Sequence, residues 1–259
     1  MITTPQLSVS GVLILLPPSE TKAGGGKGAP LDLAALTFPS LTSTRERLLD
    51  ALVTLSQDDG AARAALGLSE GQTDELERNR ALRTAATRPA IEQYTGVLYD
   101  ALDVRGLTRA QRAKADARLA VGSALFGVVG AVDAIPAYRL SSGSKLPGLG
   151  TLAAQWKPDL ADALADADRG LVVDLRSGGY AALGKVPGAV TATVVTEKPD
   201  GSRSVVSHFN KHHKGLLARA LVISRAEPGD AKAVVKVAEK VGLRAELSSP
   251  TEVTIVTAG

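Results

Sequence analysis

The chain of 259 residues contains no cysteine, a single methionine and few aromatic side chains: one tryptophan, four tyrosines and three phenylalanines. The absence of cysteine excludes disulfide bonds, thiolate-ligated metals and thiol peroxidase chemistry, and it fits a reducing compartment. Hydrophobic residues make up 44% of the sequence and charged residues 22%. This composition is typical of a globular protein that is large enough to bury a substantial core.

The sequence also lacks a long hydrophobic run. Its first apolar stretch, Val12–Leu16, is far too short to span a bilayer, and the N-terminus lacks the basic and apolar regions of a secretory signal. We therefore expect a cytoplasmic protein without a membrane partner. Residues 1–11 are polar and patternless, which predicts a flexible N-terminal extension, and residues 12–259 are predicted to form a single domain.

Strand-like runs lie toward both ends of the chain and helical patterns lie between them. This order favours an α+β fold, a compact domain with one mixed sheet and a helical insertion. The run Val12–Leu16 predicts a strand buried on both faces, and the helical part opens at Thr42 and closes with a glycine-containing turn at Gly127–Gly130. Later strands are predicted at 171–175, 190–196, 204–207, 244–247 and 253–256.

The loop after the first strand carries polar side chains and many glycines. Ser19, Glu20 and Lys22 come first, and Gly24–Gly28 follows. Backbone N–H groups of glycine-rich loops bind phosphate in other proteins, but this spacing matches neither the Walker A motif nor a dinucleotide fingerprint. A phosphate cradle and a flexible surface loop both fit, and the spacing favours the surface loop.

The net charge of +3 is too small to indicate a nucleic-acid partner by itself, so the local distribution of charge matters more. All three histidines fall within residues 208–213, and no acidic residue occurs between Asp200 and Glu227. Wound as a helix, this segment has an apolar face and a cationic face. The cationic face consists of His208, Lys211, His212, Lys214 and Arg219. It is interpreted either as a solvated surface or as a binding face for an anion.

His208 and His212 are four residues apart and can share a helical face, as metal ligands do. Two histidines without a neighbouring carboxylate make an incomplete metal site. Iron and haem stay candidate cofactors, although no motif of the chain is an obvious iron cage. His213 falls on the apolar face and is interpreted as a packed side chain.

Several motifs resemble, in order along the chain, those of the YaaA family of peroxide-stress proteins, also designated UPF0246. The resemblance covers nearly the whole chain from Val12 onward. It rests on Val12–Leu16 with Pro17–Lys22, Tyr94–Gly96, Leu125–Gly127, Ile135–Leu140, Trp156, Val173–Tyr180 and Lys211–Arg219.

This resemblance implies a cytoplasmic protein that limits free intracellular iron and so limits peroxide damage. It also implies DNA binding through a helix-hairpin-helix-like element and a positively charged cleft, on a mixed fold peculiar to the family. The sequence departs from the family pattern at three places. The lysine of Pro18–Lys22 is displaced, Gly130–Ala131 replaces a common Arg-Pro pair, and His212–Lys214 introduces imidazoles that can titrate or bind metal.

If the loops converge as in the family, one cleft collects cations for phosphate, hydroxyls for a sugar and rings for an aromatic base. The side chains concerned are Ser19, Glu20, Lys22, Tyr94, Thr95, Tyr138, Arg139, Tyr180, Lys211, Lys214 and Arg219. A DNA-binding protein would add backbone N–H groups of Gly127 and Gly130, with the lysines and Arg219 neutralising further phosphates.

The alternative function is an enzyme. It would bind a nucleotide or nucleobase-like small molecule in the same cleft and oxidise it with peroxide or a metal-bound oxygen species. In this enzyme we expect Glu20 as general base, Lys22 as phosphate clamp and Tyr138 as a further catalytic side chain. A packed polar core without a ligand fits least, because unpaired buried charge is costly. The oligomeric state is left open.

Overall fold

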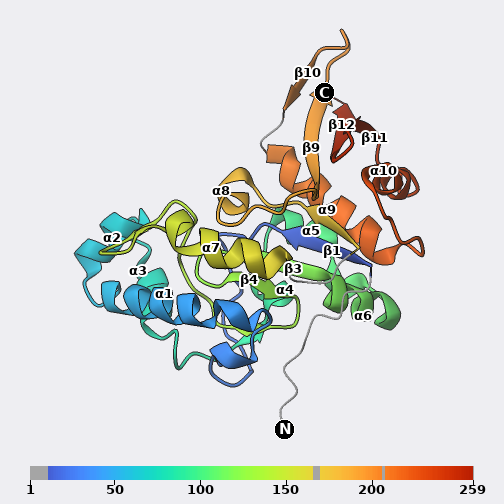
Figure 1. Ribbon diagram of the computed structural model, residues 1–259. Coiled ribbons are helices and arrows are strands. Elements are labelled where there is room, and N and C mark those ends of the chain that lie inside the picture. Colours follow the sequence, from blue (N-terminus) through green and yellow to red (C-terminus); the bar gives the residue numbers. More distant parts are fainter. Residues whose placement is uncertain (1–10, 166–169, 206–207, 259) are drawn as a thin grey trace.

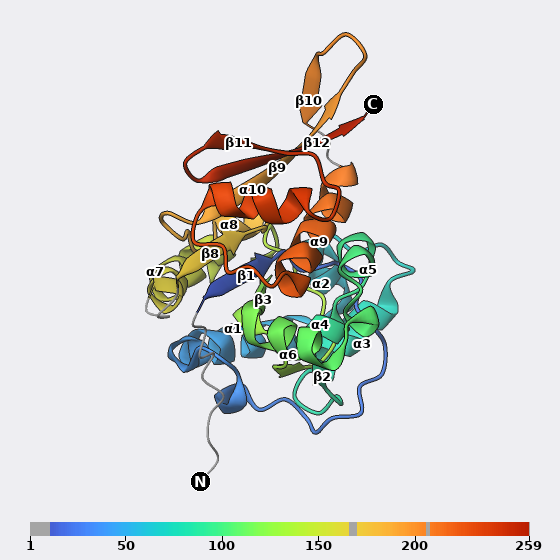
Figure 2. The same cartoon turned by 90° about the vertical axis from the view of Figure 1, so that its right-hand side faces the viewer.

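A computed structural model describes residues 11–165, 170–205 and 208–258. Within this part, one mixed sheet of eight strands forms the centre of the molecule (Figures 1 and 2). Its strands are β1 (Val12–Leu16), β3 (Leu119–Ser123), β4 (Gly127–Gly130), β8 (Leu171–Asp174), β9 (Val190–Glu197), β10 (Arg203–Val205), β11 (Ala245–Ser249) and β12 (Glu252–Ala258). The strand order is β11-β12-β9-β8-β1-β3-β4, and β10 pairs with β9.

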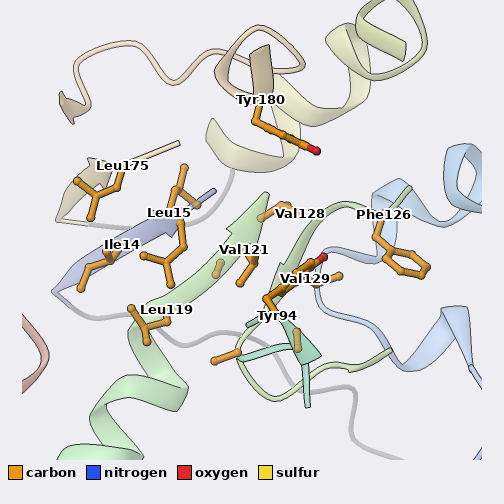
Figure 3. Packing of buried hydrophobic residues seen from close by; sticks show 14 of the residues in the cluster. Ile14, Leu15, Tyr94, Leu119, Val121, Phe126, Val128, Val129, Leu175 and Tyr180 are labelled. Carbon is orange, nitrogen blue, oxygen red and sulfur yellow. The ribbon is translucent and has the colours of Figure 1, made fainter. Parts of the chain in front are cut away.

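The middle of the sheet is parallel and its edges are antiparallel. β1 pairs in parallel with β3 and β8, and β9 pairs in parallel with β8 and β12. Parallel strands covered on both faces are apolar throughout, and every residue of β1 is buried. Figure 3 shows Ile14 and Leu15 of β1 beside Val121 of β3 in this core. The predicted mixed-sheet α+β fold is confirmed, and so are the predicted strands, with shifts of a few residues at their ends.

The helices pack on the sheet from several parts of the chain. They are α1 (Thr42–Leu55), α2 (Asp59–Leu66), α3 (Thr73–Arg80), α4 (Ala90–Gln93), α5 (Val97–Leu102), α6 (Arg109–Arg118), α7 (Leu152–Ala165), α8 (Gly178–Ala181), α9 (His208–Ile223) and α10 (Ala231–Glu239). Figures 1 and 2 show α1, α2 and α3 at one end of the molecule and α10 with β11 and β12 at the other. α9 packs against α5 and β9, whereas α4 and α7 pack against β4.

Short elements complete the described part. They are the 3-10 turns η1 (Leu33–Ala35), η2 (Pro39–Leu41) and η3 (Val104–Gly106), and two small antiparallel pairs, β2 (Arg88–Pro89) with β5 (Ala134–Ile135) and β6 (Lys145–Leu146) with β7 (Gly150–Thr151). No helix of the described residues is both long and apolar enough to cross a membrane. The predicted extension, residues 1–11, lies outside the described residues except for Gly11, whose carbonyl accepts the N–H of Leu171.

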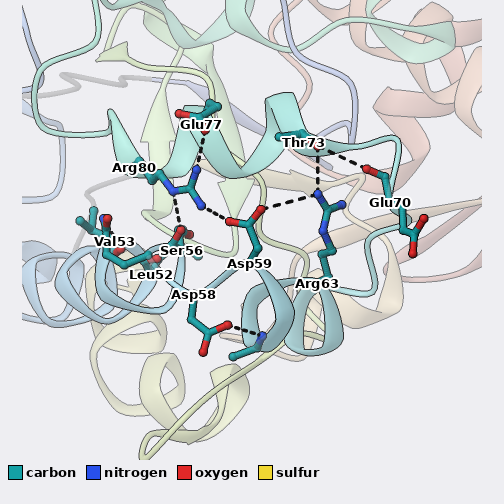
Figure 4. A network of polar contacts seen from close by, with 12 residues as sticks. Leu52, Val53, Ser56, Asp58, Asp59, Arg63, Glu70, Thr73, Glu77 and Arg80 are labelled. Atoms are coloured by element: carbon teal, nitrogen blue, oxygen red, sulfur yellow. Dashed lines mark hydrogen bonds and ion pairs between the residues drawn. The ribbon is translucent and has the colours of Figure 1, made fainter.

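A polar network holds α3 against α1 and α2 (Figure 4). Arg80 of α3 donates to the Ser56 carbonyl at the end of α1, with Nε and O 2.6 Å apart, and it also pairs with Asp59 and Glu77. Individual exposed ion pairs contribute little, but a network that joins three helices restricts where α3 can lie. This matters because α3 provides side chains to the polar centre described below.

The prediction of a glycine-containing turn at Gly127–Gly130 is wrong. These residues form the buried strand β4, which pairs with β3. At Gly127, where φ is +73°, an added Cβ would lie 2.8 Å from the Trp156 ring, so close packing explains the glycine. The N–H of Gly130 is already used, because it donates to Asp133. This segment is therefore a buried strand rather than an exposed turn, and the N–H of Gly130 is not free for a phosphate.

Candidate functional site at the carboxyl edge of the sheet

Two loops leave the carboxyl edge of the sheet next to each other, one after β1 and one after β8. These strands are parallel neighbours. In the sheet, β1 is followed by β3 on one side of the β1–β8 pair. β8 is followed by β9 on the opposite side of this pair. Ligands of open α/β sheets bind at such a switch point, where loops diverge. The first loop carries Ser19, Glu20 and Lys22, and the second leads to Tyr180 on α8.

Lys22 lies at the centre of this edge and is only 7% exposed. Its Nζ donates to the Ser19 carbonyl at 3.1 Å and to the Glu20 carbonyl at 3.3 Å, and it lies 4.3 Å from the centre of the Tyr138 ring. Burial lowers the pKa of Lys22 to about 8, although Glu20 and Glu75 oppose this change. An amine with such a pKa exchanges its proton near neutral pH, as acid–base catalysis requires.

Tyrosines surround Lys22. The hydroxyls of Tyr94 and Tyr138 are 2.9 Å apart, and the Tyr138 hydroxyl is 2.7 Å from Oγ of Ser123. Tyr99 stacks on Tyr94 with ring centres 5.7 Å apart. Burial raises the pKa of Tyr94 to about 12 and raises the pKa values of Tyr138 and Tyr180 well above their usual range. These phenols are therefore protonated near neutral pH, and Tyr138 can donate a hydrogen bond but cannot act as a base.

Glu20 and Arg139 form an ion pair at the outer side of Lys22. Oε2 of Glu20 lies 3.1 Å from Nη1 of Arg139, and the two side chains are 48% and 19% exposed. Asn79 of α3 fixes Arg139, because it hydrogen-bonds both the N–H and the carbonyl of that residue. Glu20 is therefore a half-exposed, paired carboxylate rather than a buried base, and its role as general base stays a prediction. We call Lys22, Tyr94, Tyr138, Glu20 and Arg139 the Lys22 centre.

Ser19 and Thr95 hold the loop of Lys22 in place. The N–H of Thr95 donates to Oγ of Ser19 at 3.1 Å, and Oγ1 of Thr95 donates to the carbonyl of Thr21 at 3.3 Å. The backbones of Lys22 and Tyr94 also form an isolated antiparallel bridge. Both predicted hydroxyls thus lie at the centre, but their hydrogen bonds position the loop.

A buried ion pair at the end of β8 was not predicted from the sequence. Arg176 donates to both carboxylate oxygens of Asp174, with Nε to Oδ1 at 2.9 Å and Nη2 to Oδ2 at 2.7 Å. Its Nη2 also donates to the Gly184 carbonyl at 2.9 Å. Gly122 of β3 leaves room for this side chain, since a Cβ there would lie 2.9 Å from Cδ of Arg176. The Asp-x-Arg spacing directly after a buried strand was the available signal.

Only part of the predicted cationic face of α9 is exposed to solvent. Lys211 and His212 are exposed, but Nζ of Lys214 donates to the Leu175 carbonyl at 3.2 Å, and burial lowers the pKa of Lys214 although Asp174 opposes this. The prediction that the cations of this face have no acidic partner is wrong for Arg219. Arg219 donates to the carbonyls of Leu102 and Asp103 at 2.7 and 2.6 Å and pairs with the Asp103 carboxylate at 3.3 Å. Its acidic partner is distant in sequence.

The proposed histidine site stays untested. The side chain of His208 lies outside the described residues, and the exposed His212 contacts the half-buried His213 edge to face, with ring centres 5.4 Å apart. Among the residues that are described, no three His, Asp or Glu side chains lie close enough to hold a metal ion.

The glycine-rich loop lies at the surface, as predicted, and hydrogen bonds tie it to neighbouring segments. The N–H groups of Lys27 and Gly28 donate to the Thr87 carbonyl at 3.2 and 2.9 Å. Ala23 and Gln93 are joined by two hydrogen bonds, of 2.9 and 2.8 Å. These contacts tie the loop to the segment before α4 and to α4 itself.

A pocket of about 350 Å³ lies beside the centre and includes Tyr94 and Thr95 in its wall. Its charged side chains are mainly acidic: Glu92, Asp100 and Asp103 against Arg105. Two of these acids have cationic partners outside the lining, since Glu92 pairs with Arg112 at 3.0 Å and Asp103 with Arg219 at 3.3 Å.

These features define a mixed α/β protein with a buried lysine and a tyrosine cluster at a switch point of its sheet. The chain belongs to the YaaA family of peroxide-stress proteins, because the sequence model of the family described as "Peroxide stress protein YaaA" matches residues 12–244. A UPF0246 protein of Corynebacterium efficiens is 52% identical over 94% of this chain and 98% of its own length. A UPF0246 protein of Streptomyces coelicolor is 46% identical over 93% of this chain and 94% of its own length.

Proposed function

We propose that this protein supports peroxide resistance as an enzyme whose reaction takes place at the Lys22 centre, on a nucleotide or nucleobase-like small molecule. The observation that carries the proposal is the buried Lys22 amine, which is held by two carbonyls and lies against Tyr138. Its pKa of about 8 lets it take up and release a proton near neutral pH. Groups with shifted pKa values at the carboxyl edge of a sheet are typical of catalytic sites.

The reaction class that fits a peroxide-stress family is transfer of one peroxide oxygen to the small molecule. An electron pair of the substrate attacks one oxygen of hydrogen peroxide, and the O–O bond breaks. Lys22 accepts the proton that the substrate loses and passes it to the departing hydroxide, which leaves as water. The Tyr138 phenol donates a hydrogen bond, and Arg139 orients an anionic group of the substrate.

The proposal is tested by peroxide survival of a host that lacks its own copy of the gene and carries variants of this protein. We expect Lys22→Met and Lys22→Arg to lose protection, because neither side chain exchanges a proton near neutral pH. Lys27→Met is the matched control, since Lys27 is an exposed lysine of the same loop. Full protection by Lys22→Met would show that the proposed proton transfer is not needed.

DNA binding is the second candidate function, favoured by the exposed Lys211 and His212 at the start of α9. Lys214 and Arg219, two of the five side chains of the expected cationic face, are engaged with backbone carbonyls, so we rank this function below the enzyme. Limitation of intracellular iron, implied by the family resemblance, is proposed as a consequence in the cell. It is tested by measuring chelatable iron by electron paramagnetic resonance in the same strains.

A further inference from the structure

A second pocket, of about 330 Å³, lies between the glycine-rich loop and the end of α3. One wall is formed by Gly24, Gly25 and Gly26, and the opposite walls carry mainly methyl groups. The alanines concerned are Ala81, Ala85, Ala86 and Ala137. Glu77, Arg78 and Gln93 complete the lining. The short alanine and glycine positions leave room for a planar ring, and the volume is at the lower end of the range for small-molecule sites.

The pocket adjoins the Lys22 centre through the chain itself. Its lining residue Ala23 follows Lys22 directly, and its lining residue Ala137 precedes Tyr138. The charge of Arg78, another lining residue, acts on Lys22 closely enough to contribute to the lowered pKa of the amine. The lining of the pocket thus includes the chain neighbours of Lys22 and Tyr138, and Arg78 links the pocket to Lys22 electrostatically.

The glycine wall is preformed. At Gly26 an added Cβ would lie 2.3 Å from the Thr87 carbonyl oxygen and 2.4 Å from that of Ala86, so only glycine lets the loop lie this close. The guanidinium of Arg88 donates to the Gly24 carbonyl at 3.0 Å and also to that of Gly25. A rigid wall lowers the entropic cost of binding, as a specific site requires.

Arg78 is the cation in the lining of this pocket, beside the acidic Glu77. Nη1 of Arg78 pairs with Glu75 at 3.0 Å, and its side chain is 33% exposed, which leaves further N–H donors of the guanidinium accessible. Glu77, also in the wall, pairs with Arg80 and so does not neutralise Arg78. Arginine binds phosphate and carboxylate groups with two parallel hydrogen bonds.

We propose that this alanine and glycine pocket is the substrate slot of the Lys22 centre, and that it holds a planar heterocycle with a phosphate that pairs with Arg78. The proposal rests on the proposed function for its catalytic meaning, but binding in the slot is a separate property. The substrate class that it names is a nucleoside monophosphate, for which guanosine 5′-monophosphate is the probe.

The test measures binding of guanosine 5′-monophosphate to the full chain by isothermal titration calorimetry. Ala85→Leu fills the slot, and we expect it to weaken binding at least about tenfold, since a ring cannot share space with the added carbons. Ala117→Leu on the exposed side of α6 is the control and should bind like the wild type. Arg78→Gln should weaken binding of the nucleotide but not of guanosine, and it keeps the test valid if Ala85→Leu does not fold.

The two proposals fail in different ways. No binding by the wild type, or unchanged binding by both Ala85→Leu and Arg78→Gln, would overturn the slot while leaving the peroxide survival of Lys22→Met as the test of the enzyme. Lys22→Met is expected to retain nucleotide binding. If slot variants lose binding while Lys22→Met still protects against peroxide, the slot is supported and the proposed reaction at Lys22 is wrong.

Discussion

The Lys22 centre and the cationic face of α9 both contain cations, but the burial and the partners of these cations differ. Lys22 is buried among carbonyls and tyrosine rings, and no carboxylate of the described residues lies within 4.0 Å of its amine. Arg219 of α9 has the partner that Lys22 lacks, the Asp103 carboxylate. A run of cations along the sequence is thus a weaker sign of a site than one buried amine without an acidic partner, because it is burial without a counter-charge that lowers the pKa of Lys22 to about 8.

Arg176 offers the strongest contrast with both regions, because it is a buried cation with a full set of partners. Arg176→Met leaves the Asp174 carboxylate buried without its donors, and we expect a loss of about 3–5 kcal/mol in the free energy of unfolding. Urea denaturation measures this loss. Arg225→Met, at an exposed position, is the control, and a loss of less than about 1 kcal/mol for Arg176→Met would contradict the assignment.

Arg219 tests whether the α9 face is structural. Arg219→Ala removes hydrogen bonds to two carbonyls at the end of α5, and we expect it to lower the free energy of unfolding by about 2 kcal/mol. Lys211→Ala on the same helix should leave stability unchanged, because Lys211 is exposed. Equal thermal unfolding of the two variants would mean that Arg219 is a solvated cation after all.

Lys22 makes stability depend on pH in the direction opposite to that of a paired lysine. Since its pKa falls from 10.5 to about 8 on folding, the unfolded chain binds more protons above about pH 8, and stability rises with pH. From about pH 7.5 to about pH 9 we expect a gain of about 1 kcal/mol. Above that range the buried tyrosines, whose pKa values are raised, act in the opposite direction.

Lys22→Met is the variant for this measurement, with denaturant titrations at both pH values. The methionine keeps the length of the side chain and removes the titration, so the rise of stability should disappear. A rise of the same size in Lys22→Met would assign it to another group.

The smallest effect concerns DNA. If α9 contacts phosphates through its exposed cations, Lys211→Ala should lower the slope of log affinity against log salt by about one unit. Lys214→Ala should leave the slope unchanged, because Nζ of Lys214 is directed to the Leu175 carbonyl. Fluorescence anisotropy of labelled duplex DNA over a salt series measures both, and an equal decrease in the two variants would show that Lys214 also reaches DNA.

The strands could be predicted because a strand buried on both faces is a continuous apolar run, as in Val12–Leu16. Gly127–Gly130 could not, because two glycines around Val128 and Val129 are typical of a turn. What makes this segment a strand is its pairing with β3 and the Trp156 ring against Gly127, and both are contacts with distant parts of the chain.

The residues of the Lys22 centre can be predicted from the sequence, because they follow strands or lie in motifs that resemble the family. Five of the eleven side chains that are predicted to line one cleft contact one another here, namely Glu20, Lys22, Tyr94, Tyr138 and Arg139, whereas their roles stay predictions. Asp174 and Arg176 were not named, since a charged pair at a strand end is common in exposed loops. Its importance depends on burial, which the sequence does not display.

Local pattern alone determined that this chain folds around buried strands, that it has no cysteine chemistry and that it resembles a peroxide-stress family, because composition and periodicity are properties of neighbouring residues. The tertiary structure decided which cations are available. Arg219 forms an ion pair with Asp103, and Lys214 donates a hydrogen bond to the Leu175 carbonyl. The Lys22 amine is buried without a carboxylate within 4.0 Å among the described residues. Solvation and pairing set the energy of a charge, and both depend on groups that lie far apart in sequence.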